Sequence, residues 1–162
     1  AGELLVKDWA NTHKKSYVIC RPSAVYGERD VTDRVISKFI QQAFNNQVLE
    51  VKGHREIMDF THVDDCSDGI VAATLSDHNN VTYNITKSDT KLWTIKDAAN
   101  MIIDLIGSGS MDVVDRDPTF PVRSNLDIRL ARKLLGYDPS INLEQGLERY
   151  INWYKEQSFY TN

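Results

Sequence analysis

Apolar side chains recur every three or four positions in six stretches of the chain, which is the spacing of amphipathic helices. In the second stretch, one face would carry Val35, Ile36, Phe39, Ile40 and Ala43. The predicted helices cover residues 2–13, 33–45, a stretch that begins at Asp64 or Asp65, 94–106, 130–135 and 142–154.

Short apolar runs between these helices predict strands at residues 16–20, 48–51, 57–62, 81–85 and 111–114. Alternating helices and strands favour the α/β class. Residues 17–20 are apolar throughout, as in a parallel strand covered on both faces, and proline at position 22 should end that strand. Only 81–85 is comparable, so we expect partner strands that this chain does not contain.

Helix ends carry recognisable signals. Asp64 or Asp65 and Asp127 are placed to cap helices. Thr94 with Asp97, and Asn142 with Gln145, have the spacing of capping boxes, and Gly107 and Gly136 should end helices.

Composition limits the possible classes of protein. At 162 residues the chain suits one domain, and its net charge of −4 disfavours a nucleic-acid binder. No apolar run approaches a membrane span, so we expect no membrane partner. Two cysteines, Cys20 and Cys66, are too few for a disulfide framework and suit the cytoplasm. We expect both thiols to be inert and packed in the core.

Six segments then resemble, in order, motifs of the extended short-chain dehydrogenase/reductase family, the NAD-dependent nucleotide-sugar epimerases and dehydratases. They are AGELLV at 1–6, RPSAVYG at 21–27, RVISKFIQQA at 34–43, MDFTHVDDCSDGIVAA at 58–73, YNIT at 83–86 and LDIRLARKLLGYDPSINLEQGLERYINWYKE at 126–156. They resemble the C-terminal half of that family only. The resemblance implies the last parallel strands of an NAD(P)-binding Rossmann-like sheet plus a small substrate-binding α/β lobe. Residues 1–33 and 58–86 would belong mainly to the sheet, and 34–57 and 87–162 to the lobe, within one unit covering 1–162.

The resemblance also implies a chemistry. Family members move a hydride from a sugar carbon to NAD, with a Tyr-x-x-x-Lys pair as base, and that pair would lie upstream of Ala1. Tyr17, Tyr26 and Lys7 lack the spacing, and the nearest approach to a dinucleotide fingerprint, at 107–109, follows a helix instead of a strand. We therefore expect no catalytic residue here and no activity from this chain alone, and NAD binding by this chain alone is doubtful.

The resemblance implies that this chain contains the nucleotide-sugar site of the family. Arg34 and Val35 would meet the nucleotide at a helix start, Val51 lies on the strand beside the base, and Arg116 and Arg123 would hold the phosphates. Pro22 and Ser23 would face the nicotinamide ring of NAD. The alternatives are solvated surface charges for the arginines and a simple turn at 22–23.

Two positions depart from the family pattern. Ala24 replaces an asparagine that touches the sugar nucleotide, and Met58 replaces an arginine that contacts phosphate. Arg55 could compensate for the second change. A cluster at His62, Asp64, Asp65 and Cys66 has metal-ligand types but no metal-site spacing, so capping and packing are favoured over a metal.

The favoured function is the substrate-binding half of an NAD-dependent UDP-hexose 4-epimerase. A 4,6-dehydratase or decarboxylase of the same family is the first alternative, and a non-catalytic nucleotide-sugar-binding module is the second. Expected partners are a UDP-sugar, an N-terminal Rossmann half and a second copy of the chain. Leu4, Leu5 and Trp9 would lie either in the core or in that homodimer interface.

Overall fold

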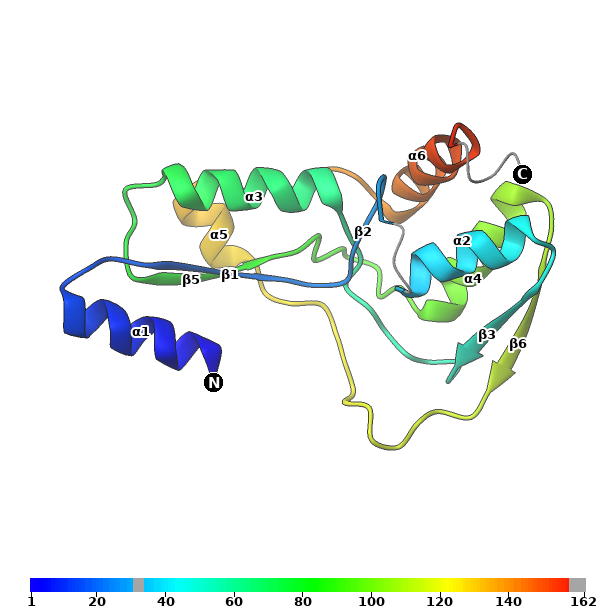
Figure 1. Ribbon diagram of the computed structural model, residues 1–162, viewed down its shortest axis with the longest axis horizontal. Helices are drawn as coiled ribbons and strands as arrows, with labels where there is room; N and C mark the ends of the chain where they lie inside the picture. The colour runs from blue at the N-terminus through cyan, green and yellow to red at the C-terminus, as the bar shows by residue number, and fades with distance from the viewer. Residues whose placement is uncertain (31–33, 158–162) are drawn as a thin grey trace.

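The computed structural model describes residues 1–30 and 34–157, arranged as two groups of elements side by side (Figure 1). One group holds α1 (Gly2–His13), β1 (Val18–Pro22), α3 (Val63–Leu75), β5 (Val81–Ile85) and α5 (Arg129–Leu135). The other holds α2 (Val35–Phe44), β3 (Val48–Lys52), α4 (Ile95–Ile106), β6 (Ser110–Val114) and α6 (Leu143–Lys155). The short strands β2 (Val25–Tyr26) and β4 (Thr61–His62) lie at the junction.

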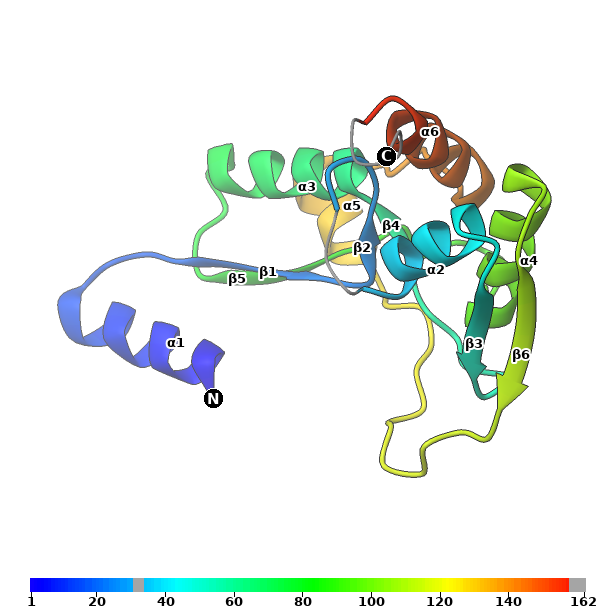
Figure 2. The ribbon, with the colours of Figure 1, turned by 45° about the vertical axis from the view of Figure 1, so that its right-hand side comes forward.

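In the first group β1 and β5 pair in parallel, from Val18 opposite Val81 to Pro22 opposite Ile85. Helices α3 and α5 cover one side of the pair, and α1 lies on the other side in both views (Figures 1 and 2). The core here is formed by Cys66, Ala73, Tyr83, Ile85, Ile128, Ala131 and Tyr137. β1 includes Pro22 as its last residue, because proline at the end of a strand can take part in the pairing without donating a hydrogen bond to the neighbouring strand.

β1 is less covered than its apolar sequence predicts. Val18, Ile19 and Cys20 are half-buried, and among the described residues β1 pairs with β5 alone. The prediction that Cys20 is buried in the core is therefore wrong, whereas Cys66 is buried as expected. Burial raises the pKa of both thiols, which keeps them protonated.

Helix α1 contributes one buried residue, Ala10. Its side chains Leu4, Leu5 and Trp9 are 72%, 70% and 55% exposed, so the prediction that Trp9 belongs to the core is wrong. The ion pair between Glu3 and Arg21, at 2.5 Å, ties the helix to β1. No helix among residues 1–30 and 34–157 is both long and apolar enough to cross a membrane.

The second group has its own core, in which α2 and α4 pack against the parallel pair β3–β6 and α6 packs against α4. Both predicted capping boxes are present, Thr94 with Asp97 and Asn142 with Gln145. Gly107 ends α4 in the left-handed region, at φ 78°. These end signals succeed because they depend only on residues three or four positions apart.

Three local predictions are wrong. His62 caps α3, since its ring accepts the backbone N–H of Asp64, so neither Asp64 nor Asp65 is the cap. Ile128 is the N-cap of α5, although the Asp127 carboxylate accepts the N–H of Arg129. Strand 57–62 shrinks to Thr61–His62, and Ile57 forms only an isolated bridge to Thr94.

Candidate functional site

A cavity of about 550 Å³ opens between the two groups, where β1 ends and α2 begins. Its wall is mostly apolar, with Val25, Tyr26, Ile36, Met58, Phe60 and Ile95, and its charged side chains are Asp30, Arg34 and Arg123. The volume lies within the usual range for small-molecule sites. Because β1 and β5 are parallel, Pro22 places the carboxyl end of β1 at the cavity, which is where α/β sheets commonly bind ligands.

A second cavity of about 240 Å³ lies beside the first. The two share the side chains of Val35, Met58, Ile95 and Arg123. Polar groups from β3, Glu50 and Lys52, line the second cavity, and Phe120 and Pro121 cover it from the segment after β6. The two cavities together provide an elongated site with an apolar floor and several cationic side chains.

Five of the nine predicted site residues come together at these cavities. Pro22, Ala24, Arg34, Val35 and Arg123 line the larger one, and Val35 and Arg123 also line the smaller one. They come from the end of β1, the start of α2 and the segment before α5, so residues about 100 positions apart in the chain meet here.

The other four predicted residues do not line either cavity. Ser23 follows Pro22 and is half-buried, and Arg55 is exposed on the turn after β3. Val51 is fully buried in the core, so only its backbone could face a base. Arg116 is bound to Glu56 at the edge of the smaller cavity. The compensation of Met58 by Arg55 therefore stays a prediction with no contact to support it.

Arg34 stands at the N-cap of α2 in an extended conformation, without a side-chain cap bond. One guanidinium nitrogen donates to the carbonyl of Val25 at 3.4 Å. Among the described residues it has no carboxylate partner. The free N–H groups of the first turn of α2 add partial positive charge at the same place, which favours an anion.

Ala24 has a left-handed backbone, with φ at +40°, while its carbonyl accepts the N–H of Thr61 at 3.3 Å. Alanine rarely adopts this region, whereas asparagine and glycine do so more readily. The strained residue is one that lines the larger cavity. Backbone strain of this kind is found most often where a site imposes it.

Arg123 and Met58 meet where the two cavities join. One guanidinium nitrogen of Arg123 lies 3.0 Å from the sulfur of Met58, a weak and neutral acceptor. The position that resembles the family's phosphate-binding arginine is therefore occupied by a thioether, with a guanidinium from a different part of the chain beside it.

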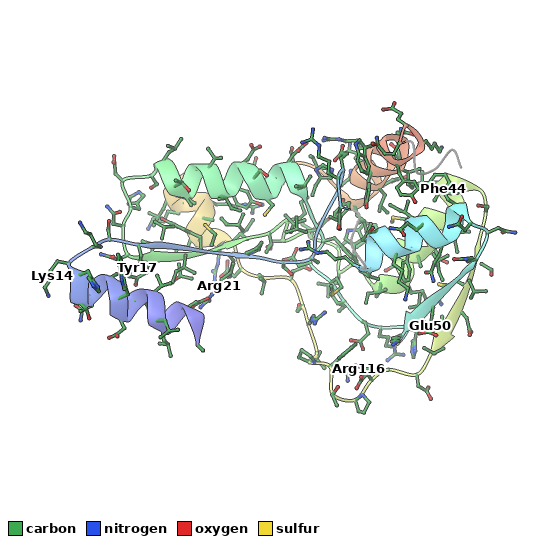
Figure 3. The ribbon with its side chains drawn as sticks, in the orientation of Figure 1. Lys14, Tyr17, Arg21, Phe44, Glu50 and Arg116 are labelled. Atoms are coloured by element: carbon green, nitrogen blue, oxygen red, sulfur yellow. The ribbon has the colours of Figure 1, made fainter. Side chains whose placement is uncertain are left out.

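Arg116 has the opposite environment. Its Nε donates to the Glu56 carboxylate and its terminal nitrogen donates to the carbonyl of Phe120. The side chains of Arg116 and Glu56 are 32% and 15% exposed, so this ion pair is half-buried. Figure 3 shows Arg116 on the long segment after β6, below Glu50 of β3. That segment, residues 115–128, contains no helix or strand and leads back from β6 to α5.

Behind the cavity, Tyr26 and His62 are both buried, with their rings 5.6 Å apart and edge to face. His62 Nδ1 accepts the N–H of Asp64, which leaves the proton on Nε2, 3.1 Å from Glu28. Burial lowers the pKa of His62 and raises that of Tyr26. Arg149 of α6 forms ion pairs with Glu28 and Asp64, which connect α6 to the loop that contains Asp30.

Two buried carboxylates hold loops around the site. Asp59 accepts the backbone N–H groups of Ser88 and Leu126, and Asp65 accepts those of Ser140 and Ile141. In this cluster Asp65 binds the backbone of a loop and His62 caps α3. Cys66 packs in the core. The packing of Cys66 agrees with the prediction, whereas the cap is formed by His62 and not by the predicted Asp64 or Asp65.

Sequence reasoning missed several cavity residues, above all Glu50, Lys52 and Phe120. The alternation along β3 contained the signal, because Leu49 and Val51 are apolar and buried, so Glu50 and Lys52 must face the other way. It also missed that Tyr83 and Lys87 have the Tyr-x-x-x-Lys spacing. These two form no catalytic pair, because Tyr83 is fully buried in the middle of β5 and the Lys87 ammonium donates to the carbonyl of Pro139.

Residues 1–86, more than half of the chain, match the model of the NAD dependent epimerase/dehydratase family. The chain belongs to this family. The predicted membership is thereby confirmed.

The relatives of this chain within the epimerase/dehydratase family are named for different activities. UDP-glucuronic acid decarboxylase 1 of Xenopus tropicalis is 32% identical over 126 residues, covering 76% of this chain and 29% of the relative. UDP-glucuronic acid decarboxylase 3 of Arabidopsis thaliana is 30% identical over 150 residues, covering 90% and 43%. The chain therefore spans less than half the length of these curated relatives.

A mutant UDP-glucuronic acid 4-epimerase of Bacillus cereus, solved with UDP-4-deoxy-4-fluoro-glucuronic acid and NAD, superposes with a TM-score of 0.86 at 30% identity. The superposition covers 96% of this chain and 50% of that one. It confirms the predicted α/β class, with the parallel strands of a Rossmann-like epimerase.

NAD is the cofactor of this family, and the described residues fit a limited part in holding it. Pro22 lines the larger cavity and Ser23 follows it, at the carboxyl end of β1, where a ring could lie against the chain. Gly107 and Gly109 follow α4 instead of a strand, so no dinucleotide fingerprint is formed there. In members of this family the bound NAD accepts a hydride.

Proposed function

We propose that this chain is the nucleotide-sugar-binding half of an NAD-dependent nucleotide-sugar epimerase, with a UDP-sugar as its substrate. One observation carries the proposal: Arg34 and Arg123 line the same 550 Å³ apolar cavity at the carboxyl end of β1. A diphosphate needs cationic donors, and a sugar and base need an apolar floor with a few polar groups.

Each part of the site has a role in this proposal. The arginines and the start of α2 bind the diphosphate, the smaller cavity beside β3 receives the base, and the sugar lies near Pro22 and Ala24. These residues bind and orient the substrate, and holding it in place converts the reaction into an intramolecular step. The proton and hydride transfers belong to residues that this chain does not supply.

Among the activities of the family, 4-epimerisation remains our first choice, and the Bacillus cereus 4-epimerase is among the similar solved structures. Dehydration or decarboxylation is the alternative, and relatives named UDP-glucuronic acid decarboxylases favour the latter. Incubating the chain, joined to an NAD-binding half, with UDP-glucose and UDP-glucuronic acid separates these outcomes by their products.

Calorimetric titration with UDP, UDP-glucose and NAD tests the binding proposal directly. We expect UDP and UDP-glucose to bind with similar affinity, and NAD to bind weakly or not at all. Absence of any heat with UDP, from a chain that melts cooperatively, would overturn the proposal.

A non-catalytic nucleotide-sugar-binding module is the second candidate. It is favoured by the burial of Tyr83, which leaves the one Tyr-x-x-x-Lys spacing in the chain without a usable base. UDP binding without turnover, even after an NAD-binding half has been added, would support this candidate over the enzyme.

A further inference from the structure

We propose that this chain has a second binding site, for a chain of phosphate groups, at the end of the β1–β5 pair opposite the candidate functional site. A cavity of about 350 Å³ lies there, between the end of α1 and the starts of β1 and β5. We call it the lysine cavity, and it is lined by Lys7, Ala10, Asn11, Lys14, Lys15, Tyr17 and Asn80. The inference is independent of the proposed function, because this cavity shares no residue with the other two.

The lysine cavity lies at the amino end of the parallel pair. Tyr17 and Asn80 directly precede β1 and β5, whereas Pro22, at the carboxyl end of β1, lines the larger cavity of the candidate site. Figure 3 shows Lys14 and Tyr17 together where α1 ends and β1 begins, with Arg21 toward the other end of that strand. The two sites are therefore separated by the length of β1.

The first argument is the charge of the cavity. Three of its seven lining residues are lysines, and none of the seven carries a carboxylate. Within the part of the chain that the structure describes, Lys7, Lys14 and Lys15 form no ion pair. Glu3, one helical turn before Lys7, is already paired with Arg21 at 2.5 Å. A hollow lined by charges of one sign attracts a ligand of the opposite sign, so an anion is favoured.

The second argument is that the end of the helix does not account for all three lysines. The partial negative charge at a helix C-terminus favours nearby cations, which explains Lys14 and Lys15. Lys7 lies more than one turn before His13, the last residue of α1, and this effect is confined to the last turn. Lys7 and Lys14 are seven positions apart, about two turns, so the face of α1 that carries Lys7 also carries Asn11 and continues to Lys14. That face borders the cavity.

The third argument is the fixed position of the remaining polar groups. The N–H of Asn80 donates to the carbonyl of Tyr17 at 2.7 Å, and Asn80 Oδ1 accepts the N–H of Tyr17 at 3.3 Å. Because Oδ1 serves as an acceptor, the side-chain NH₂ of Asn80 remains as a donor at the cavity. The carbonyl of Ala10 accepts the N–H of Lys15 at 2.9 Å, so its hydrogen-bonding capacity is already used by the backbone.

These features favour phosphate over other small anions. A lysine ammonium binds phosphate as a point charge, whereas planar, bidentate recognition of a carboxylate is the property of arginine, and no arginine lines this cavity. Three ammonium groups match a ligand with several negative charges along its length, and the volume is at the small end of the range for ligand sites. A short chain of phosphates has both properties.

Calorimetric titration of the full chain with tripolyphosphate tests the site. We expect binding that weakens at high salt, because the contacts join exposed charges. Lys7→Gln and Lys14→Gln should each weaken binding about 2- to 5-fold, as is usual for one exposed charge, and the triple variant that adds Lys15→Gln should lose it. Lys133→Gln is the matched control and should bind as wild type, because Lys133 is exposed on α5 and lines none of the three cavities.

Asn80→Asp tests the cavity without removing a lysine. Aspartate tolerates the left-handed backbone of residue 80, at φ 61°, and keeps an oxygen for the N–H of Tyr17, so the fold should be retained. Its negative charge should weaken tripolyphosphate binding at least as much as one lysine variant does. In two-dimensional NMR spectra of the wild type, tripolyphosphate should shift the amide signals of Lys14, Tyr17 and Asn80 and leave those around Arg34 in place.

Adenosine triphosphate carries the same chain of three phosphates on a nucleoside, so it distinguishes two sources of the ligand. Equal affinities for the two probes would identify the inorganic chain as sufficient, and tighter binding of adenosine triphosphate would identify a nucleotide. In both cases the triple lysine variant should lose the binding.

Three results would overturn the inference: no tripolyphosphate binding by the wild type, equal binding by the wild type and the triple variant, or shifts confined to the amides around Arg34. UDP binding, which tests the proposed function, should be the same in the wild type and in every lysine variant, so the two claims can fail separately. Thermal melts of each variant distinguish a lost site from a lost fold.

Discussion

The carboxylate of Asp59 accepts the backbone N–H of Leu126 at 2.9 Å, which joins residues 67 positions apart. Its other oxygen accepts the N–H of Ser88, also at 2.9 Å, and the side chain is buried. Through this contact the segment just before β4 holds the end of the irregular segment that carries Arg123. The shape of the cavities therefore depends on a buried acceptor that lines neither of them.

Asp59→Asn should destabilise the chain by about 1–3 kcal/mol, because an amide has one acceptor oxygen and leaves a buried N–H unpaired. Urea unfolding measures the change, and Asp68→Asn, at an exposed aspartate on α3, is the control. UDP affinity should fall together with stability, since the Arg123 segment loses its anchor. Equal midpoints for the two variants would contradict this account.

The left-handed backbone of Ala24 predicts a split between two substitutions. Ala24→Val should cost about 1 kcal/mol or more, because a branched side chain is poorly tolerated at positive φ, whereas Ala24→Asn should be neutral or stabilising. Both side chains would lie at the larger cavity and have space there. A urea midpoint for the asparagine variant as low as that of the valine variant would show that φ is not the cause.

Gly146 of α6 allows Tyr26 to pack beside the cavity. A Cβ at this position would overlap Tyr26 Oη and lie 2.8 Å from its Cζ and 3.0 Å from His62. Gly146→Ala should therefore destabilise by about 1–3 kcal/mol in thermal melts, despite the better helix propensity of alanine.

Glu148→Ala is the matched control for Gly146→Ala, because Glu148 is exposed on the same helix. Adding Tyr26→Phe to Gly146→Ala should recover part of the loss by removing the overlapping oxygen. A melting temperature for Gly146→Ala at or above the wild-type value would rule out the steric account.

Stability should fall as the pH drops from about 7 to 5, in part because of His62. Burial lowers its pKa below the usual 6.5, against the opposing effect of Glu28, Asp64 and Asp65 and with a contribution from Arg149. The unfolded chain then binds a proton at a pH where the folded chain does not, so acidification favours unfolding.

His62→Asn keeps an acceptor for the cap of α3 and removes the titrating ring. Melting temperatures of this variant should depend less on pH than those of the wild type between pH 7 and 5. The exposed histidines His13, His54 and His78 are unchanged in the variant, so the comparison isolates residue 62. An unchanged pH slope in the variant would exclude His62 as the source.

Self-association stays a prediction. Leu4, Leu5 and Trp9 form an exposed apolar group on α1, and the described part of the chain offers them no core to join. Sedimentation of the wild-type chain and of Trp9→Glu would compare their states of assembly, and a strictly monomeric wild type at high concentration would count against the prediction.

Local signals along the chain predicted the helices, both capping boxes, the glycine ends and the family motifs. Such features depend on residues a few positions apart, so their spacing can be recognised without knowledge of distant contacts. The same is true of the face of β3, where alternation shows that Glu50 and Lys52 point away from the core.

The roles of the arginines and aspartates could not be recognised in this way. Arg116 meets Glu56 across 60 positions, and Arg123 meets Met58 across 65, so an equal positive charge is paired in one case and available in the other. Asp65 resembles a helix cap in the sequence. In the fold its carboxylate instead accepts the N–H groups of Ser140 and Ile141, because α3 places it against the segment just before α6. Charge and hydrogen-bonding capacity belong to each residue type, whereas the partner that uses them is set by long-range packing.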